Sequence, residues 1–399
     1  MMSSLTEPAE RLAEIVPSRI RAIFDRAAEL EAEGAHVLHF EIGRPDFDTP
    51  RVVKDAAADA LAAGRVHYGP NAGTPELRDA IADHLGAASG LTYERDQVLV
   101  TIGASEAVFL AIMAFCGPGD EVIIPVPAWP AYEAAVRLAD ATPVFLPLRA
   151  SDGYRLDPER VRQTLTPRTR LVVVCSPHNP TGAVLDAERL VALADVLHGT
   201  RALVLSDEIY SELVYDAVHV PVAAVSDLRE RTLTVGGFAK AFAMDGWRLG
   251  WLAGPRALVT TALRVRQFTT TCPPTFVQDA AVVALRETTD ERARMRAAFA
   301  ERRAAALEIL ARQSIFQVAG ADGAFYLYLT YAERFGASDG FAAQLLEEAH
   351  VALVSGTAFG PTRAEDYALR VSYACSVDDV REGITRLVQH AEAMVLSGR

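Results

Sequence analysis

Residues 170–208 read RLVVVCSPHNPTGAVLDAERLVALADVLHGTRALVLSDE, which is an apolar run, an amphipathic stretch and a second apolar run. The two runs, RLVVVCS and ALVLSDE, are short and rich in Val and Leu, which is typical of buried strands. The stretch between them, DAERLVALADVL, has its apolar residues at helical spacing. This order predicts two parallel strands joined by a helix that covers one face of a sheet.

The same alternation continues on both sides of this unit. Further strand-like runs are QVLVTIG, EVIIPV, TPVFLPL, TLTVGG and RLGWLAG. We therefore expect an α/β fold whose large domain, residues 46–290, contains a mostly parallel sheet flanked by helices. After residue 291 a long helix rich in Arg, Ala and Glu precedes several short strands. This mixture indicates a smaller α+β domain formed by residues 1–45 and 291–399.

The composition limits the partners that this chain can have. It has 399 residues, a net charge of −13 and no long basic run, so we expect neither nucleic acid nor an anionic membrane as a partner. Four separated cysteines without a C-x-x-C pair argue against a disulfide framework and a zinc site, and we predict no metal. Because the sequence shows no signal-peptide pattern and no apolar run of bilayer length, we expect a cytoplasmic protein.

Lysine is nearly absent, since the 39 basic residues include only Lys54 and Lys240. Arginine stays protonated, whereas a lysine amine can lose its proton, attack a carbonyl group and form a Schiff base. Lys54 lies in a polar helix stripe and is interpreted as a solvated side chain. Lys240 follows the run TLTVGG in a loop of small residues, which makes it a candidate catalytic group.

Polar residues stand where the predicted strands end. Asn179 lies between two prolines after RLVVVCS, Asp207 ends ALVLSD, and Lys240 follows TLTVGG. Because ligands of open parallel sheets bind outside the carboxyl ends of the strands, we expect these groups to share one edge. A carboxylate buried there needs a partner, and a protonated heterocyclic nitrogen would serve.

The run QVLVTIG ends in Gly103, Ala104 and Ser105 at the start of a predicted helix. The free N–H groups and the dipole of a helix start favour an anion such as a phosphate. An anion site, a buried acid, a fixed amide and a lysine are the groups that a phosphorylated pyridine aldehyde requires when it acts as an electron sink.

The chain resembles a class I (fold type I) pyridoxal-phosphate-dependent aminotransferase of the prokaryotic aspartate/aromatic aminotransferase-like group. The matching stretches, in the family's order over residues 36–375, are EIGRPDFDTP, HYGPNAGTPELRDAI, VTIGASEAV, SPHNPTGAV, SDEIY, GGFAKAFAMDGWRLGW, GAFYLYL and LRVSYA. The resemblance implies transfer of an amino group from an L-amino acid to a 2-oxo acid in a ping-pong scheme. The cofactor would be pyridoxal 5′-phosphate, held as a Schiff base on Lys240, in a homodimer with shared active sites.

The resemblance also implies a role for each matching position. Lys240 would bind the cofactor and move the α-proton, Asp207 would pair with the ring nitrogen, and Tyr210 would hydrogen-bond the ring oxygen together with Asn179. Trp129 would stack on the ring. The phosphate ligands would be Gly103, Ala104, Ser105 and Arg248.

Two further sets of residues follow from the same resemblance. Tyr68 would reach the phosphate of the neighbouring subunit. Arg370 would bind the substrate α-carboxylate as a bidentate fork, and the backbone at Ile42 and Gly43 would line the substrate entrance. The residues that select the substrate side chain would come from the N-terminal segment, from the stretch 267–276 and from the partner subunit.

Several positions depart from the family pattern. Gly237 and Ala239 lack the hydroxyl group that many relatives use for the phosphate, and Ala128 replaces a larger aromatic residue, which would widen the substrate side of the pocket. His178 also occurs in the C–S β-lyase branch. A pyridoxal-phosphate-dependent C–S β-lyase, or another specialised enzyme of this fold that abstracts the α-proton, is therefore the alternative function. A non-enzymatic regulator that kept the fold is a third.

The sequence carries few signals for the substrate side chain. No second arginine is placed to receive the distal carboxylate of a dicarboxylic substrate. Aromatic or medium apolar side chains fit the presence of Tyr68, Trp129, Phe268 and Phe359, although core packing explains such residues equally well.

Overall fold

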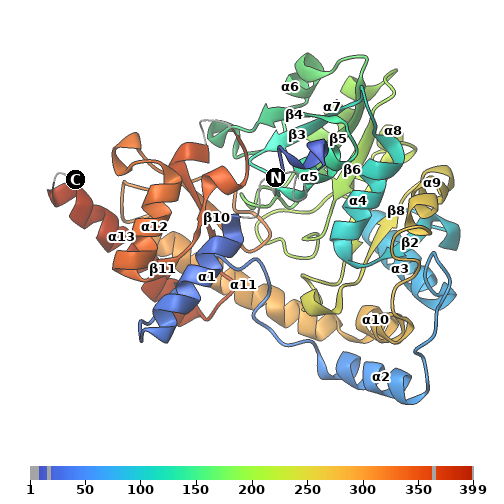
Figure 1. Ribbon diagram of the computed structural model, residues 1–399, viewed down its shortest axis with the longest axis horizontal. Helices are drawn as coiled ribbons and strands as arrows, with labels where there is room; N and C mark the ends of the chain where they lie inside the picture. The colour runs from blue at the N-terminus through green and yellow to red at the C-terminus, as the bar shows by residue number, and fades with distance from the viewer. Residues whose placement is uncertain (1–8, 16–18, 362–364, 398–399) are drawn as a thin grey trace, which may run out of the picture.

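The computed structural model describes residues 9–15, 19–361 and 365–397 of the chain. A large sheet with its helices lies on one side of the molecule and a smaller group of strands and helices on the other (Figure 1). The long helix α11 (Thr289–Leu310) extends from the smaller group towards the larger one. Within these described ranges, no helix has both the length and the apolar character needed to cross a membrane.

The large sheet contains seven strands in the spatial order β2-β8-β7-β6-β5-β3-β4. Strand β8 is antiparallel to both neighbours and every other pairing is parallel, which confirms the expected mostly parallel sheet. The strands are β2 (Val98–Thr101), β3 (Glu121–Val126), β4 (Thr142–Pro147), β5 (Thr169–Cys175), β6 (Leu203–Asp207), β7 (Thr232–Gly237) and β8 (Gly250–Ala253).

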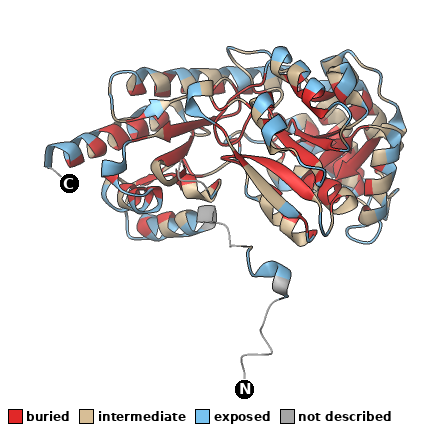
Figure 2. Cartoon of the chain, turned by 90° about the horizontal axis from the view of Figure 1, so that it is seen from above, coloured by how far each residue is buried: buried red, intermediate tan, exposed pale blue. Residues whose placement is uncertain are grey.

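Helices cover both faces of this sheet, because alternate residues of each buried strand point to opposite sides. Val122 and Ile124 of β3 pack with α4, α5 and α9 on one face, whereas Ile123 packs with α6 and α7 on the other. Helices α2, α3 and α10 cover the second face near β2 and β8. The strands are therefore buried between helices whose outer sides are exposed (Figure 2).

The helices around the large sheet have short spans that fit the expected alternation of strands and helices. They are α2 (Arg51–Ala62), α3 (Pro75–Ser89), α4 (Gly103–Phe115), α5 (Ala131–Leu138), α6 (Pro158–Thr164), α7 (Ala187–Leu197), α8 (Ser226–Arg229), α9 (Arg256–Arg266) and α10 (Thr275–Glu287).

The smaller group is built on an antiparallel four-stranded sheet of order β12-β13-β10-β9 and on a two-stranded parallel pair, β1 and β11. Its remaining core comes from α11, α12 and α13. The bounds are β1 (Leu38–His39), β9 (Gln317–Val318), β10 (Tyr326–Thr330), α12 (Ser338–Ala349), β11 (Val351–Ala352), β12 (Val354–Ser355), β13 (Ala368–Ser372) and α13 (Val377–Ser397).

The N-terminal residues contact both units. Helix α1 (Arg19–Ala32) packs through Ala27 and Leu30 against Leu346 and Ala352 of the smaller group. The short 3₁₀ helix η1 (Glu10–Leu12) instead lies beside α5 of the large unit. The division into a large domain, 46–290, and a small domain, 1–45 with 291–399, stays a prediction, and the contact between η1 and α5 places residues 10–12 beside the large unit instead.

One ion pair ties α11 to the segment that enters the large unit. Arg302 donates two hydrogen bonds to the carboxylate of Asp46, at 2.6 and 2.8 Å, and its guanidinium lies over the rings of Phe47 and Phe299. A bidentate pair of this kind fixes geometry as well as adding energy. It joins the two units at the point where the chain passes from one to the other.

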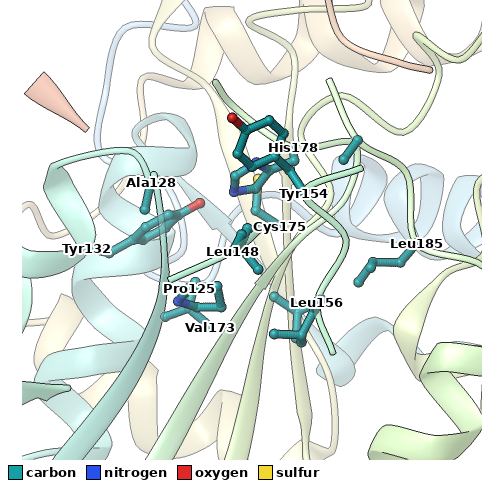
Figure 3. A pocket seen from close by; sticks show the side chains of 12 residues that line it. Pro125, Ala128, Tyr132, Leu148, Tyr154, Leu156, Val173, Cys175, His178 and Leu185 are labelled. Carbon is teal, nitrogen blue, oxygen red and sulfur yellow. The ribbon is translucent and has the colours of Figure 1, made fainter. Parts of the chain in front are cut away.

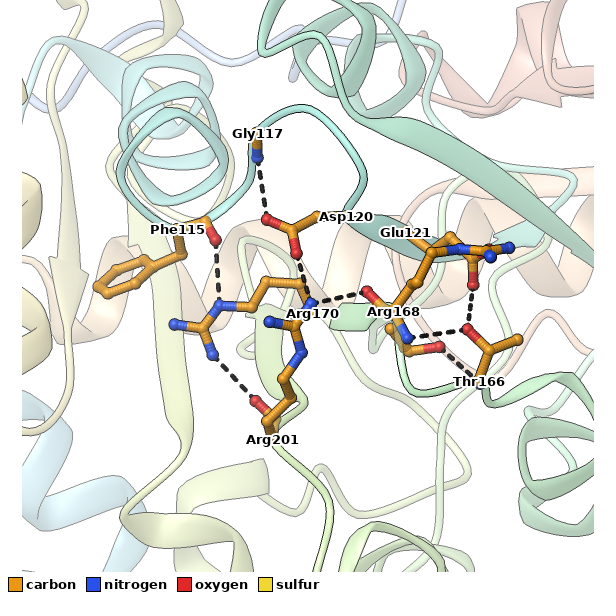
Figure 4. A network of polar contacts seen from close by, with 9 residues as sticks. Phe115, Gly117, Asp120, Glu121, Thr166, Arg168, Arg170 and Arg201 are labelled. Atoms are coloured by element: carbon orange, nitrogen blue, oxygen red, sulfur yellow. Dashed lines mark hydrogen bonds and ion pairs between the residues drawn. The ribbon is translucent and has the colours of Figure 1, made fainter.

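The amino ends of the central strands are joined by arginines and carboxylates (Figure 4). Arg201, before β6, donates to the Asp120 carboxylate before β3 and to the carbonyl of Arg168 before β5. Arg168 in turn pairs with Glu121, the first residue of β3. The network closes the edge of the sheet opposite the carboxyl ends of these strands.

We predict that Asp120→Ala lowers the free energy of unfolding by about 1 kcal/mol, because the substitution removes an acceptor for Arg201 and for the N–H of Gly117. Chemical denaturation followed by circular dichroism measures this change. Glu159→Ala is the matched control, since it removes only an exposed pair with Arg162 and should cost at most about 0.5 kcal/mol. Equal losses in the two variants would show that the contacts of Asp120 add no more to stability than an exposed ion pair does.

Candidate active site

Strands β2, β5, β6 and β7 run in the same direction, so their carboxyl ends lie at one edge of the large sheet. The structure therefore places Gly103, Asn179, Asp207 and Lys240 along this edge. Asp207 is the last residue of β6, and Lys240 comes three residues after the end of β7. The sheet order alone brings together groups that are more than 130 residues apart in the sequence.

Lys240 lies partly buried, with its amine facing the smaller unit. Its Nζ donates to the carbonyl of Gly43 and lies 5.6 Å from the ring centre of Tyr210. Burial lowers the pKa of Lys240 from 10.5 to about 8, and the charges of Arg370 and Arg248 act in the same direction, while Asp245 and Asp207 oppose them. At neutral pH this amine therefore has a much larger unprotonated fraction than an ordinary lysine, as a nucleophile or base requires.

Asp207 is almost completely buried, with 3% of its surface exposed. One carboxylate oxygen accepts from the hydroxyl of Tyr132 at 2.6 Å, and the other accepts from the N–H of Ile209 at 3.2 Å. No basic side chain among the described residues forms an ion pair with it, and burial raises the pKa of its carboxyl group. The Asp207 carboxylate therefore has hydrogen-bond donors but no ion-pair partner among the described residues.

Arg370 is a buried cation that forms no ion pair with any carboxylate of the described residues. It lies on β13, is 2% exposed, and donates to the carbonyl of Glu41 at 2.7 Å and to Oδ1 of Asn179 at 3.4 Å. Its guanidinium lies over the rings of Tyr326 and Phe359, 4.6 and 5.0 Å from their centres. Its Nε is buried without a hydrogen-bond partner. Such a group is suited to an incoming carboxylate.

A small cluster connects Lys240 to Arg370. The hydroxyl groups of Tyr210 and Tyr326 lie 2.9 Å apart, and a Cβ atom on Gly43 would lie 2.7 Å from the Tyr326 hydroxyl. Only glycine therefore allows the backbone at position 43 to approach this closely. Ile42 precedes it and is partly buried.

The start of α4 and Arg248 form a second cationic region at the same edge. A Cβ atom on Gly103 would lie 2.8 Å from Nη2 of Arg248, so the guanidinium lies directly at the helix start. Gly250 of β8 lies close to the backbone at this helix start, since a Cβ atom on Gly250 would lie 2.7 Å from the N atom of Ala104. The first-turn N–H groups of a helix, here those of Gly103, Ala104 and Ser105, have no intrahelical acceptor. This arrangement can bind an anion.

The structure gives a physical reason for one departure from the family pattern. A Cβ atom on Gly237 would lie 3.0 Å from Cα of Gly250 and 3.1 Å from the carbonyl oxygen of Leu249. These contacts are tighter than side chains usually make. Close packing between β7 and β8 therefore favours glycine at a position where a hydroxyl could otherwise reach the anion.

Tyr132 is a site residue that the sequence reasoning missed. It lies on α5, three residues after Trp129, and its ring packs edge-on against the Trp129 ring with centres 5.5 Å apart. Because its hydroxyl donates to Asp207, Tyr132 joins the aromatic side of the site to the buried acid. Tyr326 was missed as well, because the alternating stretch FYLYL does not reveal which of its two tyrosines faces the site.

His178 is fixed by its own loop. Its Nδ1 lies 2.8 Å from the Thr181 hydroxyl, and burial lowers the pKa of the imidazole to about 4, so the ring is neutral at pH 7. It lines a cavity beside Tyr132 and Cys175 (Figure 3). The cavity volume, about 20 Å³, has room for a water but not for an amino acid.

Tyr68 is the candidate that this chain does not bring to its own site. It is 91% exposed, in a loop attached to the start of α10, where the Thr275 hydroxyl donates to the carbonyls of Arg65 and His67. Phe268, in the stretch 267–276, is similarly 90% exposed. Two large aromatic side chains thus lie on the outside of a single chain.

Comparison with known proteins gives one consistent family. The sequence pattern of aminotransferase class I and II matches residues 35–387. A bifunctional aspartate aminotransferase and glutamate/aspartate-prephenate aminotransferase from Petunia hybrida is 39% identical, over 94% of this chain and 81% of its own length.

Solved structures agree with this result. The aspartate aminotransferase of Rhizobium meliloti is 38% identical and matches with a TM-score of 0.91, over 97% of this chain and 99% of its own. An aromatic aminotransferase from Pyrococcus horikoshii is 36% identical with a TM-score of 0.87, over 93% and 100% of the two chains.

We predict that Lys240 titrates with a midpoint near pH 8 in the ligand-free protein, well below the usual 10.5, because burial disfavours its charged form. NMR of protein labelled at the lysine Cε atoms suits this test, since the chain contributes only two lysine signals. Lys54→Arg leaves one signal and so assigns it. A Lys240 midpoint near 10.5 would show that the amine is solvated and would contradict the geometry described above.

Proposed function

This chain belongs to the class I and II aminotransferases, and we propose that it uses pyridoxal 5′-phosphate, bound between Lys240 and Asp207, to move amino groups. The overall reaction transfers an amino group from an amino acid to a 2-oxo acid. The single observation that carries the proposal is that a buried lysine amine with a lowered pKa and a buried acid that forms no ion pair within the described chain both follow strands at the same sheet edge.

The charged groups of the site are complementary to the charged groups of pyridoxal 5′-phosphate, which are its ring nitrogen and its phosphate. Asp207 would hold the pyridine nitrogen in its protonated form, because a buried carboxylate is stabilised by a cation. The start of α4, with Gly103, Ala104 and Ser105, would hold the phosphate together with Arg248. The loss of one neutral hydrogen bond at Gly237, about 1 kcal/mol, leaves these ligands in place.

The remaining ring contacts would come from side chains at the ends of β3, β5 and β6. Trp129 follows β3 and would cover one face of the ring. Asn179 and Tyr210 would donate to the ring oxygen. Both already lie beside the cluster of Arg370 and Tyr326, through the contacts given above.

The bound cofactor supplies an electrophilic aldehyde carbon and a ring that accepts the electron pair left when the substrate loses its α-proton. Lys240 Nζ would remove that proton from Cα, and its lowered pKa matches this task at neutral pH. Arg370 would hold the α-carboxylate with two parallel hydrogen bonds and so orient Cα towards Lys240. The backbone of Ile42 and Gly43 would line the entrance.

Both halves of the reaction would use the same residues. The amino acid enters, its oxo acid leaves, and a second oxo acid then occupies the same position against Arg370. This order gives ping-pong kinetics, with parallel lines in a two-substrate plot. β-Elimination, the alternative chemistry, is not favoured by the comparisons, since the relatives described above are named aminotransferases.

We propose further that the protein is a homodimer in which Tyr68 reaches the phosphate of the neighbouring subunit. The exposure of Tyr68 and Phe268 supports this, because large aromatic side chains that protrude from one chain are typical of interfaces. A cavity is lined by Arg248, Pro274 and Phe276, and Thr275, which stands between the last two, contacts the loop that carries Tyr68. A second subunit placed there would complete the site.

Borohydride reduction of the protein loaded with pyridoxal 5′-phosphate should attach the cofactor permanently to Lys240. Peptide mass spectrometry should find the added mass on the Lys240 peptide and none on the Lys54 peptide, which is an internal control. Lys240→Ala should lose the label and should lower kcat by about 10²–10⁴-fold or more, the usual contribution of a positioned base. Retention of the label by Lys240→Ala would overturn the assignment of this residue.

Sharing of sites between subunits can be tested by complementation. Tyr68→Ala and Lys240→Ala should each be impaired alone. Mixing and reassociating them in equal amounts should restore activity to about a quarter of the sites, because only mixed dimers contain one site with both native residues. If mixing restores nothing although hybrids form, Tyr68 acts within its own chain or not at all.

A further inference from the structure

The first turn of α4, which forms the phosphate end of the proposed site, also carries an acid, Glu106. Only 9% of the Glu106 side chain is exposed. A carboxylate in this turn and a bound phosphate would repel each other and compete for the positive end of the same helix. A phosphate site at this place therefore needs a cation that neutralises Glu106.

Arg266 is that cation. It is the last residue of α9, which lies beside α4 (Figure 1), and its side chain is fully buried. Its Nη1 lies 3.1 Å from Oε2 of Glu106 and donates to the carbonyl of Val100 at 2.6 Å. Because Val100 belongs to β2, the guanidinium contacts both the strand and the helix that flank the turn 101–103.

The charge of Arg266 depends on Glu106 for compensation. The Nε and Nη2 atoms of Arg266 are buried without a hydrogen-bond partner. Glu106 is the one carboxylate among the described residues with which Arg266 forms an ion pair. Since an isolated buried charge is costly, each member of this pair stabilises the other.

The Glu106 carboxylate is also held by contacts with neutral groups. Its Oε2 accepts from the N–H of Ile102, the residue before α4, at 2.5 Å, and its Oε1 accepts from the hydroxyl of Thr270. Both oxygens are therefore occupied, and the carboxylate stays beside Arg266.

We infer that Arg266 and Glu106 form a neutral positioning pair for the phosphate of the cofactor. Arg266 cancels the negative charge in the first turn of α4, which leaves the N–H groups of that turn and Arg248 to bind the phosphate. It also fixes the turn through the carbonyl of Val100. This role rests on the proposed function, and it concerns two residues that act through α4 without touching the cofactor.

The test compares pyridoxal 5′-phosphate with pyridoxal, which lacks the phosphate, in titrations of the cofactor-free full-length dimer followed by protein fluorescence. Arg266→Gln should raise the Kd for pyridoxal 5′-phosphate about tenfold, because it leaves an unpaired carboxylate in the first turn of α4. The same substitution should change the Kd for pyridoxal by less than about twofold, since pyridoxal carries no charge that Glu106 would repel.

Two further variants separate charge from structure. Glu106→Gln removes the negative charge and should lower the Kd for pyridoxal 5′-phosphate or leave it unchanged. Arg266→Gln combined with Glu106→Gln removes both charges and should return this Kd to within about threefold of the wild-type value. If Glu106→Gln weakens phosphate binding, or if the double substitution weakens it as much as Arg266→Gln does, the pair is only structural and the inference is wrong. These two variants decide the question even if Arg266→Gln alone does not fold.

Arg155→Gln is the matched control. Arg155 also donates to a carbonyl and to a carboxylate, those of Val184 and Asp322, at 3.1 and 2.6 Å. Its partners belong to the loop after β5 and to the segment between β9 and β10, so the substitution should leave both Kd values unchanged. An equal rise in the Kd for pyridoxal 5′-phosphate in Arg155→Gln and Arg266→Gln would show that lost stability, and not charge, weakens binding.

The outcomes distinguish this role from the proposed function. If the wild-type protein binds pyridoxal 5′-phosphate no tighter than pyridoxal, and borohydride does not attach the cofactor to Lys240, the proposed function itself fails. If the cofactor attaches to Lys240 but Arg266→Gln binds it with wild-type affinity, the proposed function holds and the role of the pair is wrong.

Discussion

The arrangement of the candidate active site depends on one buried carboxylate that forms no ion pair within the described part of the chain. Asp207 ends a central strand of a parallel sheet, where water cannot solvate it, and burial raises its pKa. The tyrosine on α5 and the N–H of Ile209 orient the carboxylate but do not neutralise it. A protonated ring nitrogen on a bound ligand would offset the cost of burying this carboxylate. Ligand binding should therefore stabilise the sheet through Asp207.

The charged side chains at the two edges of the large sheet differ in whether they form ion pairs. At the amino ends of β3, β5 and β6, arginines and carboxylates are paired with one another. At the carboxyl ends, Arg370 and Asp207 are both buried and each lacks an ionic partner in the described chain. The paired charges stabilise the edge at the amino ends of the strands. The charges without ionic partners at the opposite edge can bind a ligand that carries both a positive and a negative group.

Much of this arrangement could be predicted from the sequence, because it depends on strand ends. The positions of Asp207 and Lys240 follow from two apolar runs and the rule that parallel strands share their carboxyl edge. The antiparallel direction of β8 could not be predicted, since RLGWLAG has the same pattern as a parallel strand. Nor could Tyr132, whose contact with Asp207 depends on how α5 packs on the sheet. The exposure of Tyr68 is a property of the folded surface that no local pattern encodes.

Lys54 lies on α2 with 45% of its side chain exposed, paired with Asp48 and remote from Arg370 and Asp207 in the sequence. Apart from the amino terminus, it is the only amine besides Lys240 in a chain otherwise reliant on arginine. Amine-directed coupling to a resin or an electrode would therefore attach the molecule at only two places once Lys240 is occupied, through α2 or through the amino terminus. Lys54→Arg would leave the amino terminus alone and so give one orientation without an engineered tag.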